Sequence, residues 1–254
     1  MGGWHRGPLL AFDLETDGPD PLDARIITAC VAQIDGTGQT APGVQSWVLK
    51  PVRPIPDGAA EIHGYTTDRA TAEGQDPAAG VKEIATRLAL ASAGGVPIVA
   101  FNAAYDLTVI DREMRRHGIG EVTDVAPVID PFVIDKKIDR YRKGKRTLTA
   151  ACEHYGVRLD GAHDASFDAL AAARCAWAIA HRTSQVARMS LDELHAWQVE
   201  AKQEQDASLA QYFRRIARQQ KELDDQIELM AKAEGCTGAW PLIPFAPERQ
   251  ESLS

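Results

Sequence analysis

Cysteine is scarce in this sequence, and long apolar runs are absent from it. The four cysteines form no Cys-x-x-Cys pair; they are Cys30, Cys152, Cys175 and Cys236. They are too few for a disulfide framework, so we expect reduced thiols and a cytoplasmic location. No stretch reaches the roughly 18 apolar residues that a membrane span needs, and the amino-terminal GGWHRGP lacks the apolar core of a signal peptide. The sequence therefore predicts no contact with a membrane.

An excess of positive charge is also missing. The chain has 28 Lys and Arg residues against 36 Asp and Glu residues, which gives a net charge of −8 and a pI near 5.4. Nonspecific binding of nucleic acids depends on Lys and Arg, so this balance argues against a general polyanion binder. It does not exclude a nucleic-acid substrate, because a local basic patch or bound metal ions can reverse the field at a site.

The order of the expected elements indicates the fold class. The 254 residues, 44% of them hydrophobic, suffice for one α/β domain with an appendage or for two small domains. Three strands come first as an antiparallel meander, and two short strands then alternate with helices. The expected strands cover residues 9–15, 24–35, 44–51, 97–101 and 125–130, and the main expected helices cover 77–93, 103–117, 147–157 and 165–182. This order predicts an α/β fold with a mixed five-stranded sheet and helices on its faces.

The pattern changes near residue 183, so we divide the chain into residues 1–182 and a helical extension, 183–254. Residues 190–234 contain neither Gly nor Pro, and an apolar stripe at spacings of three and four predicts one long helix. The stripe, with one polar interruption, comprises Leu209, Phe213, Ile216, Gln220, Leu223, Ile227 and Met230. It is either a packing seam against the rest of the chain or an interface for a partner. We expect the apolar GAWPLIPF, residues 238–245 and named the coda below, to fold back onto the molecule.

Two acids stand at the end of the first expected strand, in LLAFDLETDG. Successive side chains of a strand alternate between its faces, so Asp13 and Glu15 point to the same side. Carboxylates held this close share either a proton or a cation, and hard divalent ions such as Mg²⁺ prefer oxygen ligands. The alternative is a strand that ends in an Asp17–Gly18 turn with both acids solvated.

Two further segments carry candidate site residues. In FNAAYDL, Asp106 lies four residues after Asn102, on the first turns of a helix; taken alone, Asp106 fits a favourable charge near a helix N-terminus and Asn102 an ordinary cap. In HDASFDA, His163 precedes Asp168 by five residues. These two converge only if His163 lies in the loop before the helix, and each alone fits a structural or solvated side chain.

Together, in this order, the three segments resemble the exonuclease motifs of the DnaQ-like, or DEDD, superfamily of 3′–5′ exonucleases. DLETDG is similar to the first motif, FNAAYDL to the second and HDASFDA to the third. A histidine five residues before the final Asp resembles the histidine branch of the superfamily (DEDDh). EIHGYT, residues 61–66, also resembles an HGIT-type segment of proofreading-subunit relatives. The resemblance covers roughly residues 8–182.

The resemblance implies an RNase H-like sheet and two Mg²⁺ or Mn²⁺ ions about 4 Å apart, which stabilise the attacking and leaving oxygens. It implies a metal-dependent exonuclease that releases nucleoside monophosphates from the 3′ end of single-stranded or frayed DNA. Asp13, Glu15 and Asp168 would hold one ion, while Asp13 would also bridge to the second. Asp106 would support that second ion, and His163 would be the general base. The implied substrate-binding residues are Leu14, which would wedge against a base, Thr16 and His63 near the sugar, and Asn102.

Residues 136–146, KKIDRYRKGKR, form the strongest basic concentration in the chain, with seven Lys or Arg residues. In an otherwise acidic protein, Lys143, Lys145 and Arg146 are candidates for guiding the phosphate backbone. The alternative is a solvated basic loop.

Three other functions remain open from the sequence. The first is an RNA-trimming exoribonuclease, since the same fold serves both nucleic acids. The second is a noncatalytic adaptor, and the third is a proofreading subunit that acts only within a polymerase complex. The helical extension would serve a homodimer or a polymerase partner.

Overall fold

The computed structural model describes residues 3–123, 125–159 and 165–246 of the 254-residue chain. Its centre is a five-stranded sheet in the order β3-β2-β1-β4-β5. The strands are β1 (Leu9–Thr16), β2 (Ile26–Ile34), β3 (Gln45–Val48), β4 (Ile98–Val99) and β5 (Val128–Ile129). The first three pair antiparallel, whereas β4 and β5 run parallel to β1. The predicted mixed sheet is therefore confirmed.

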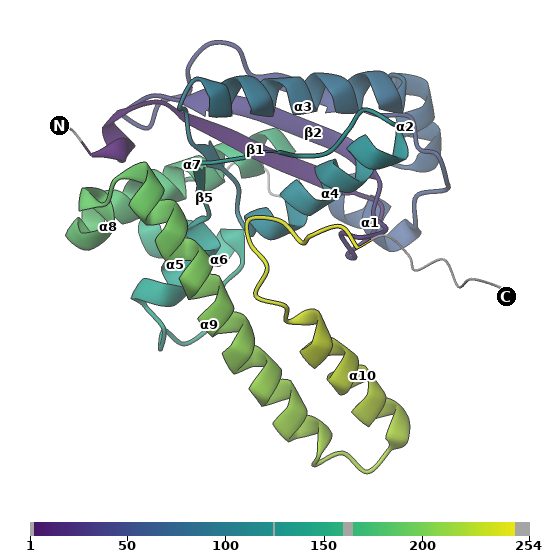
Figure 1. The fold of residues 1–254 in the computed structure, drawn as a ribbon. Helices are drawn as coiled ribbons and strands as arrows, with labels where there is room; N and C mark the ends of the chain where they lie inside the picture. Colours follow the sequence, from purple (N-terminus) through teal and green to yellow (C-terminus); the bar gives the residue numbers. More distant parts are fainter. Residues whose placement is uncertain (1–2, 124, 160–164, 247–254) are drawn as a thin grey trace, which may run out of the picture.

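Helices cover both faces of the sheet (Figure 1). Before the third motif they are the 3₁₀ turn η1 (Trp4–Arg6), α1 (Asp57–His63), α2 (Thr67–Glu73), α3 (Pro77–Ala93), α4 (Ala103–Arg116), α5 (Pro131–Ile138) and α6 (Leu148–Tyr155). After it come α7 (Ala165–Arg182), α8 (Ser184–Arg188), α9 (Leu191–Ala217) and α10 (Leu223–Gly235).

Alternation along β1 divides the core into two layers. Leu10, Phe12 and Leu14 belong to the cluster that includes residues of α3 and α4. Leu9 and Ala11 belong to the opposite cluster, which includes residues of α6 and α7. Because side chains alternate, Asp13 and Glu15 share the face of Leu9 and Ala11. The two acids therefore point toward the layer that contains α7.

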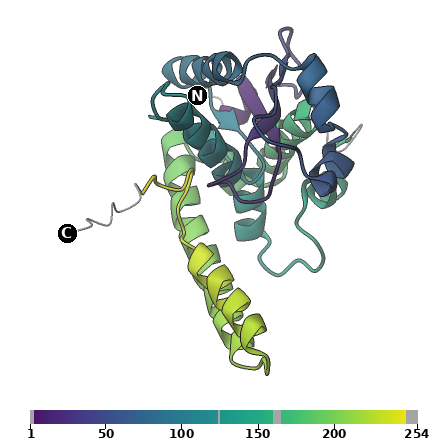
Figure 2. The ribbon, with the colours of Figure 1, turned by 90° about the vertical axis from the view of Figure 1, so that its right-hand side faces the viewer.

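The helical extension differs from the prediction of one long helix. The chain leaves α9 after Ala217 and returns as α10, which packs against α9, so the two form a hairpin that projects from the body (Figures 1 and 2). The intervening residues 218–222 read RQQKE and offer no apolar side chain to bury. Folding back lets α10 pack against α9, and Ala217 and Ala233 are both buried, whereas Leu223, Ile227 and Met230 of the stripe remain exposed.

The extension is also part of both cores. Ala201 and Trp240 join the layer of α3 and α4, whereas Val186 and Leu194 join the layer of α7. The coda folds back as predicted: Trp240 is buried, and the backbone N–H of Ile243 reaches α4. The boundary at residue 182 stays a prediction, because side chains on both sides of it share the same cores.

Candidate active site

Three carboxylates meet where β1 approaches the start of α7. Oxygens of Asp13, Glu15 and Asp168 all lie within 4.8 Å of one another, and all three residues are half-buried. Asp168 lies in the first turn of α7, where the positive end of the helix dipole favours an acid. Residues distant in the sequence are thus brought together. Within the described residues, this is the one cluster of three His, Cys, Asp or Glu residues with such spacing.

Asp106 enters the site because β4 is short. β4 pairs with β1 only at Leu10 and Ala11, so the backbone of β1 beyond them has no neighbouring strand on that side. The N–H of Leu14 instead donates to Oδ1 of Asp106 at 3.1 Å. This bond places Asp106 beside the backbone that joins Asp13 and Glu15, although its oxygens lie outside the group of three.

The environment of Asp106 opposes its negative charge. The residue is only 4% exposed, and burial raises the pKa of its carboxyl well above the usual range. Negative charge on Asp130 and Glu15 raises this pKa further, whereas hydrogen bonds from the backbone of Asp106 itself and of Leu14 lower it. A cation bound nearby would reverse the balance in favour of the ionised form.

The donor set fits a hard divalent cation. All three clustered ligands are carboxylates, the oxygen donors that Mg²⁺ and Mn²⁺ prefer, and no thiolate or imidazole belongs to the cluster among the described residues. Half-burial leaves room for water, which Mg²⁺ retains when it binds to proteins. His163, the expected general base, lies outside the described residues, two positions before α7 begins.

Tyr105, which was not predicted, links the first and second motifs. The hydroxyl of Thr16 donates to the carbonyl of Gly18 at 2.9 Å and also contacts the Tyr105 hydroxyl, which itself donates to Gly18. Burial raises the pKa of Tyr105 to about 12. The pair fixes the turn after β1. The only signal in the sequence was the position of Tyr105 directly before Asp106.

His63 and Leu14 are both buried. The N–H of Tyr65 donates to Nδ1 of His63 at 3.2 Å, so the proton of the neutral ring lies on Nε2. Burial lowers the pKa of His63, although the nearby Thr16 backbone favours the protonated ring; within the described structure Nε2 has no hydrogen-bond partner. Leu14 is 6% exposed and packs in the core on the face opposite the carboxylates. It therefore supports the sheet, contrary to the expected wedge against a base.

Asn102 occupies the N-cap position of α4, but its side chain does not cap the helix. Its backbone is left-handed, with φ of 66°, and the residue is exposed. The carboxylate of Asp130 caps the helix instead, because it accepts the N–H groups of Asn102 and Ala103 at 2.9 Å each. The same buried carboxylate accepts the N–H of Phe132 at 2.9 Å and so also caps α5. Sequence reasoning missed this role of Asp130.

The fold uses two arginines of the basic segment internally, because Arg142 and Arg146 both pair with Asp135. Nη1 of Arg146 lies 2.7 Å from Oδ2 of Asp135, and its guanidinium also donates to the carbonyls of Asp139 and Arg142. Asp135 is 1% exposed. Arg146 is therefore a structural residue, contrary to the expected contact with phosphate. Lys143 and Lys145 are exposed and stay candidates.

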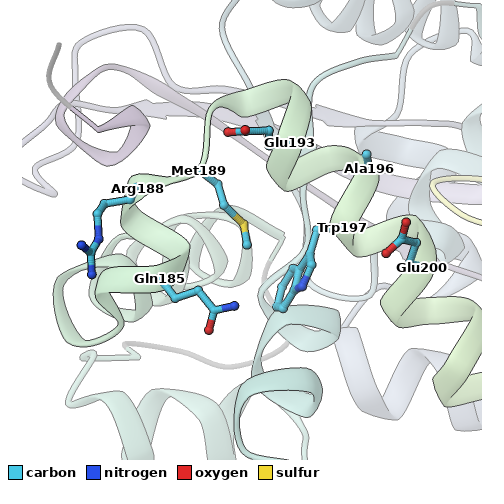
Figure 3. Close-up of a pocket in the computed structure, with 7 residues that line it drawn as sticks. All are labelled: Gln185, Arg188, Met189, Glu193, Ala196, Trp197 and Glu200. Atoms are coloured by element: carbon cyan, nitrogen blue, oxygen red, sulfur yellow. The ribbon is translucent and has the colours of Figure 1, made fainter.

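A separate cavity of about 670 Å³ lies between α8 and α9 (Figure 3). Its lining includes Arg188, Met189, Trp197 and Glu200. α8 follows the carboxyl end of α7, whereas Asp168 stands in the first turn of that helix. The intervening helix spans roughly 20 Å at 1.5 Å per residue. The cavity is thus not part of the carboxylate site.

Known proteins resemble this chain over the same region. The family model described as Exonuclease (RNase_T) matches residues 10–176. A DNA polymerase III of the PolC type from Halalkalibacterium halodurans is 24% identical over 168 residues, which is 66% of this chain and 11% of that protein.

Solved structures of exonuclease I share the fold. One of them has a TM-score of 0.62 and 20% identity over 70% of this chain and 42% of its own. E. coli exonuclease I in complex with a dT13 oligonucleotide has a TM-score of 0.61 and 20% identity, over 71% of this chain and 42% of its own. The zinc-bound form of the complex of E. coli exonuclease I with single-stranded DNA also has a TM-score of 0.61 and 20% identity, over 71% of this chain and 42% of its own. The chain thus spans less than half the length of these proteins.

No described helix is both long and apolar enough to cross a membrane.

The family match extends over more than half of the chain and includes Asp13, Glu15, Asp106 and Asp168. The chain therefore belongs to the Exonuclease family, within the DnaQ-like superfamily of 3′–5′ exonucleases.

Proposed function

We propose that this chain is a metal-dependent 3′–5′ exonuclease of the histidine branch. Its substrate is the 3′ end of single-stranded or frayed DNA, and its product is a nucleoside monophosphate. The observation that carries the proposal is the convergence of Asp13, Glu15 and Asp168, with oxygens within 4.8 Å of one another. In an acidic protein, cations bound at such a site reverse the local field and so favour binding of a phosphodiester.

The carboxylates would hold two Mg²⁺ or Mn²⁺ ions. Asp13, Glu15 and Asp168 would ligate the first, whereas Asp13 and Asp106 would serve the second. When bound, the ions stabilise negative charge on the attacking and leaving oxygens. The bond from the Leu14 N–H to Asp106 fixes the orientation of the Asp106 carboxylate before an ion arrives.

His163 would be the general base. Its motif places it five residues before Asp168, and histidine is the side chain whose unperturbed charge change falls closest to neutral pH. A neutral ring can accept the proton that the attacking water loses.

The terminal nucleotide would lie against the end of β1. Thr16, Tyr105 and His63 surround the turn after that strand, and the exposed amide of Asn102 stands at the start of α4. Thr16 and His63 would approach the sugar, as the motifs suggest, and Tyr105 would hold Thr16 in place. Exposed Lys143 and Lys145 would guide the backbone farther from the cut.

The hairpin of α9 and α10 would bind a second copy of this chain. Leu223, Ile227 and Met230 are 67%, 58% and 41% exposed on one stripe of α10. The last turns of α9 are basic, with Arg214 and Arg215, and the first turn of α10 is acidic. In the described structure these two turns form no ion pair with each other, so a two-fold arrangement can match the opposite charges.

The alternative for this hairpin is a polymerase partner, an idea that the PolC-type relative supports. Sedimentation of the pure protein over a wide concentration range separates the two. A reversible dimer that Leu223→Lys weakens supports self-association, whereas a monomer at every concentration favours the polymerase partner. A cytoplasmic location also stays a prediction.

Degradation ladders test the activity. Single-stranded DNA, duplex DNA and RNA, each labelled at the 5′ or the 3′ end, are incubated with Mg²⁺ or Mn²⁺. We expect 5′-labelled single-stranded DNA to shorten stepwise and 3′-labelled DNA to release mononucleotide at once. Asp13→Asn is the matched inactive control. Preferential trimming of RNA would favour the exoribonuclease alternative, and intact substrates under all conditions would refute the enzymatic proposal.

A further inference from the structure

The coda runs along α4 on the side away from the carboxylate site. Residues two apart on a helix point about 200° apart, so Thr108 faces away from Asp106. Oγ1 of Thr108, which is fully buried, accepts the N–H of Ile243 at 2.8 Å. One turn farther, Nη2 of Arg112 donates to the carbonyls of Ile243 and Pro244 at 2.9 and 3.0 Å. The coda therefore binds the back of the helix whose front carries Asp106.

The same segment reaches the amino-terminal end of α4 through Asp130. Nε1 of Trp240 donates to Oδ2 of Asp130 at 3.4 Å, and this carboxylate caps α4 through the N–H groups of Asn102 and Ala103. The N–H of Asp130 in turn donates to Oε1 of Gln198, on α9, at 2.6 Å. Side chains of the extension thus support Asp130, the residue that caps the amino-terminal end of α4.

We propose that the coda is a positioning strap for α4, and that it sets the place of Asp106 at the metal centre. The proposal rests on the proposed function for the identity of that centre. On the site side, Leu14 donates to Asp106 and the hydroxyls of Thr16 and Tyr105 meet. β4 has only two residues and cannot by itself fix the helix. Coda contacts on the opposite face supply a further restraint, so the extension contributes to the active site without touching the substrate.

Thr108 offers a matched set of substitutions in the full-length protein. Thr108→Val keeps the shape of the side chain and removes the acceptor for the Ile243 N–H, whereas Thr108→Ser keeps the hydroxyl. Thr86→Val is the control, because the Thr86 hydroxyl only donates to the carbonyl of Lys82, within its own helix. Trp240→Phe independently removes the hydrogen bond from the coda to Asp130. It provides the test if Thr108→Val does not fold.

Two measurements need no nucleic acid. The first is Mn²⁺ affinity, from electron paramagnetic resonance of the free ion, and the second is hydrogen exchange at the Leu14 amide. Losing a residue that supports a metal ligand typically weakens metal binding about 10-fold or more. We expect Thr108→Val and Trp240→Phe to show that loss, together with faster exchange at Leu14. Thr108→Ser and Thr86→Val should behave like the wild type in both measurements.

The outcomes separate the strap from the proposed function. A lower melting temperature for Thr108→Val, with wild-type Mn²⁺ affinity and wild-type exchange at Leu14, would overturn the strap and leave the nuclease proposal intact. A wild type that binds no Mn²⁺ would refute the metal centre, while exchange at Leu14 would still show whether the coda holds Asp106. Wild-type exchange at Leu14 in both variants would overturn the strap in either case.

Discussion

Substitutions of Arg146 and of its basic neighbours distinguish charges that stabilise the fold from charges that bind the substrate. Arg146→Gln removes contacts to Asp135 and to the carbonyls of Asp139 and Arg142. Breaking a buried ion pair outright costs about 3–5 kcal/mol, because it leaves a charge without a partner. Asp135 keeps Arg142 at 2.6 Å and the hydroxyl of Tyr155 at 2.6 Å, so its charge stays compensated.

We therefore expect Arg146→Gln to reduce the free energy of unfolding by a smaller amount, about 1.5–3 kcal/mol. In a domain of this size, that reduction lowers the melting temperature by roughly 3–12 °C. Lys143→Gln combined with Lys145→Gln changes only exposed side chains, so the free energy of unfolding should stay within about 0.5 kcal/mol per substitution. Urea denaturation followed by circular dichroism measures both values.

Binding should show the opposite pattern. For single-stranded DNA, each phosphate that the protein no longer neutralises reduces the slope of log K against log salt by about 0.7. The double lysine variant should thus have a slope smaller by about 1.4, whereas Arg146→Gln should keep the wild-type slope. Fluorescence anisotropy with a labelled oligonucleotide in Ca²⁺, at several salt concentrations, measures it. An Arg146→Gln protein of wild-type stability with a reduced slope would refute the structural assignment.

Three further predictions concern catalysis and pH. Asp168→Asn should abolish both cleavage and high-affinity Mn²⁺ binding, and retention of binding would remove Asp168 from the ligand set. His163→Ala should slow cleavage about 100-fold or more with metal affinity unchanged; a loss of Mn²⁺ binding would contradict its role as a base. Burial lowers the pKa of His195, whose Nδ1 accepts the Val128 N–H at 3.1 Å, so the unfolded chain binds more protons below pH 6.5. The free energy of unfolding should therefore fall as the pH drops through 6.5 and below, and His195→Asn should reduce that fall. Urea denaturation midpoints at pH 7.5 and 5.5 measure the loss of stability. Equal losses in the wild type and the variant would contradict the role assigned to His195.

Local patterns in the sequence placed two of the carboxylates on one strand face, and the family resemblance implied the rest of the cluster. Alternation along β1 puts Asp13 and Glu15 on one face, and the buried run before them marks the strand. The resemblance of the third motif implied Asp168 beside them, and the structure places this residue in the first turn of α7. The alternation needed no knowledge of distant contacts, whereas only the family resemblance linked the three motifs.

Contacts between residues distant in the sequence could not be predicted from local patterns. Asp130 looks like any acid before a helix, and nothing local shows that it caps two helices at once. Gln198 completes the open edge of β5, where its amide accepts the Asp130 N–H and donates to the Val128 carbonyl. A polar residue in a Gln-rich helix does not reveal such a partner. Arg146 was misjudged for a related reason, since its buried partner Asp135 lies 11 residues away.

The turn between α9 and α10 was missed because sequence signals for it are weak. Residues 190–234 contain neither Gly nor Pro, and helix propensity alone favours continuation. The chain turns at residues 218–222, which are all polar and interrupt the regular spacing of apolar residues. The two helices pack against each other, with Ala217 and Ala233 buried, and that packing depends on the three-dimensional arrangement.

The position of a bound ion tests the central claim most directly. Crystals grown with Mn²⁺ and a short single-stranded oligonucleotide would show the ion in an anomalous difference map. We predict a peak about 2.0–2.2 Å from oxygens of Asp13, Glu15 and Asp168, close to the distances at which Mg²⁺ binds oxygen ligands. An active protein whose Mn²⁺ peaks all lie away from these three carboxylates would contradict the account.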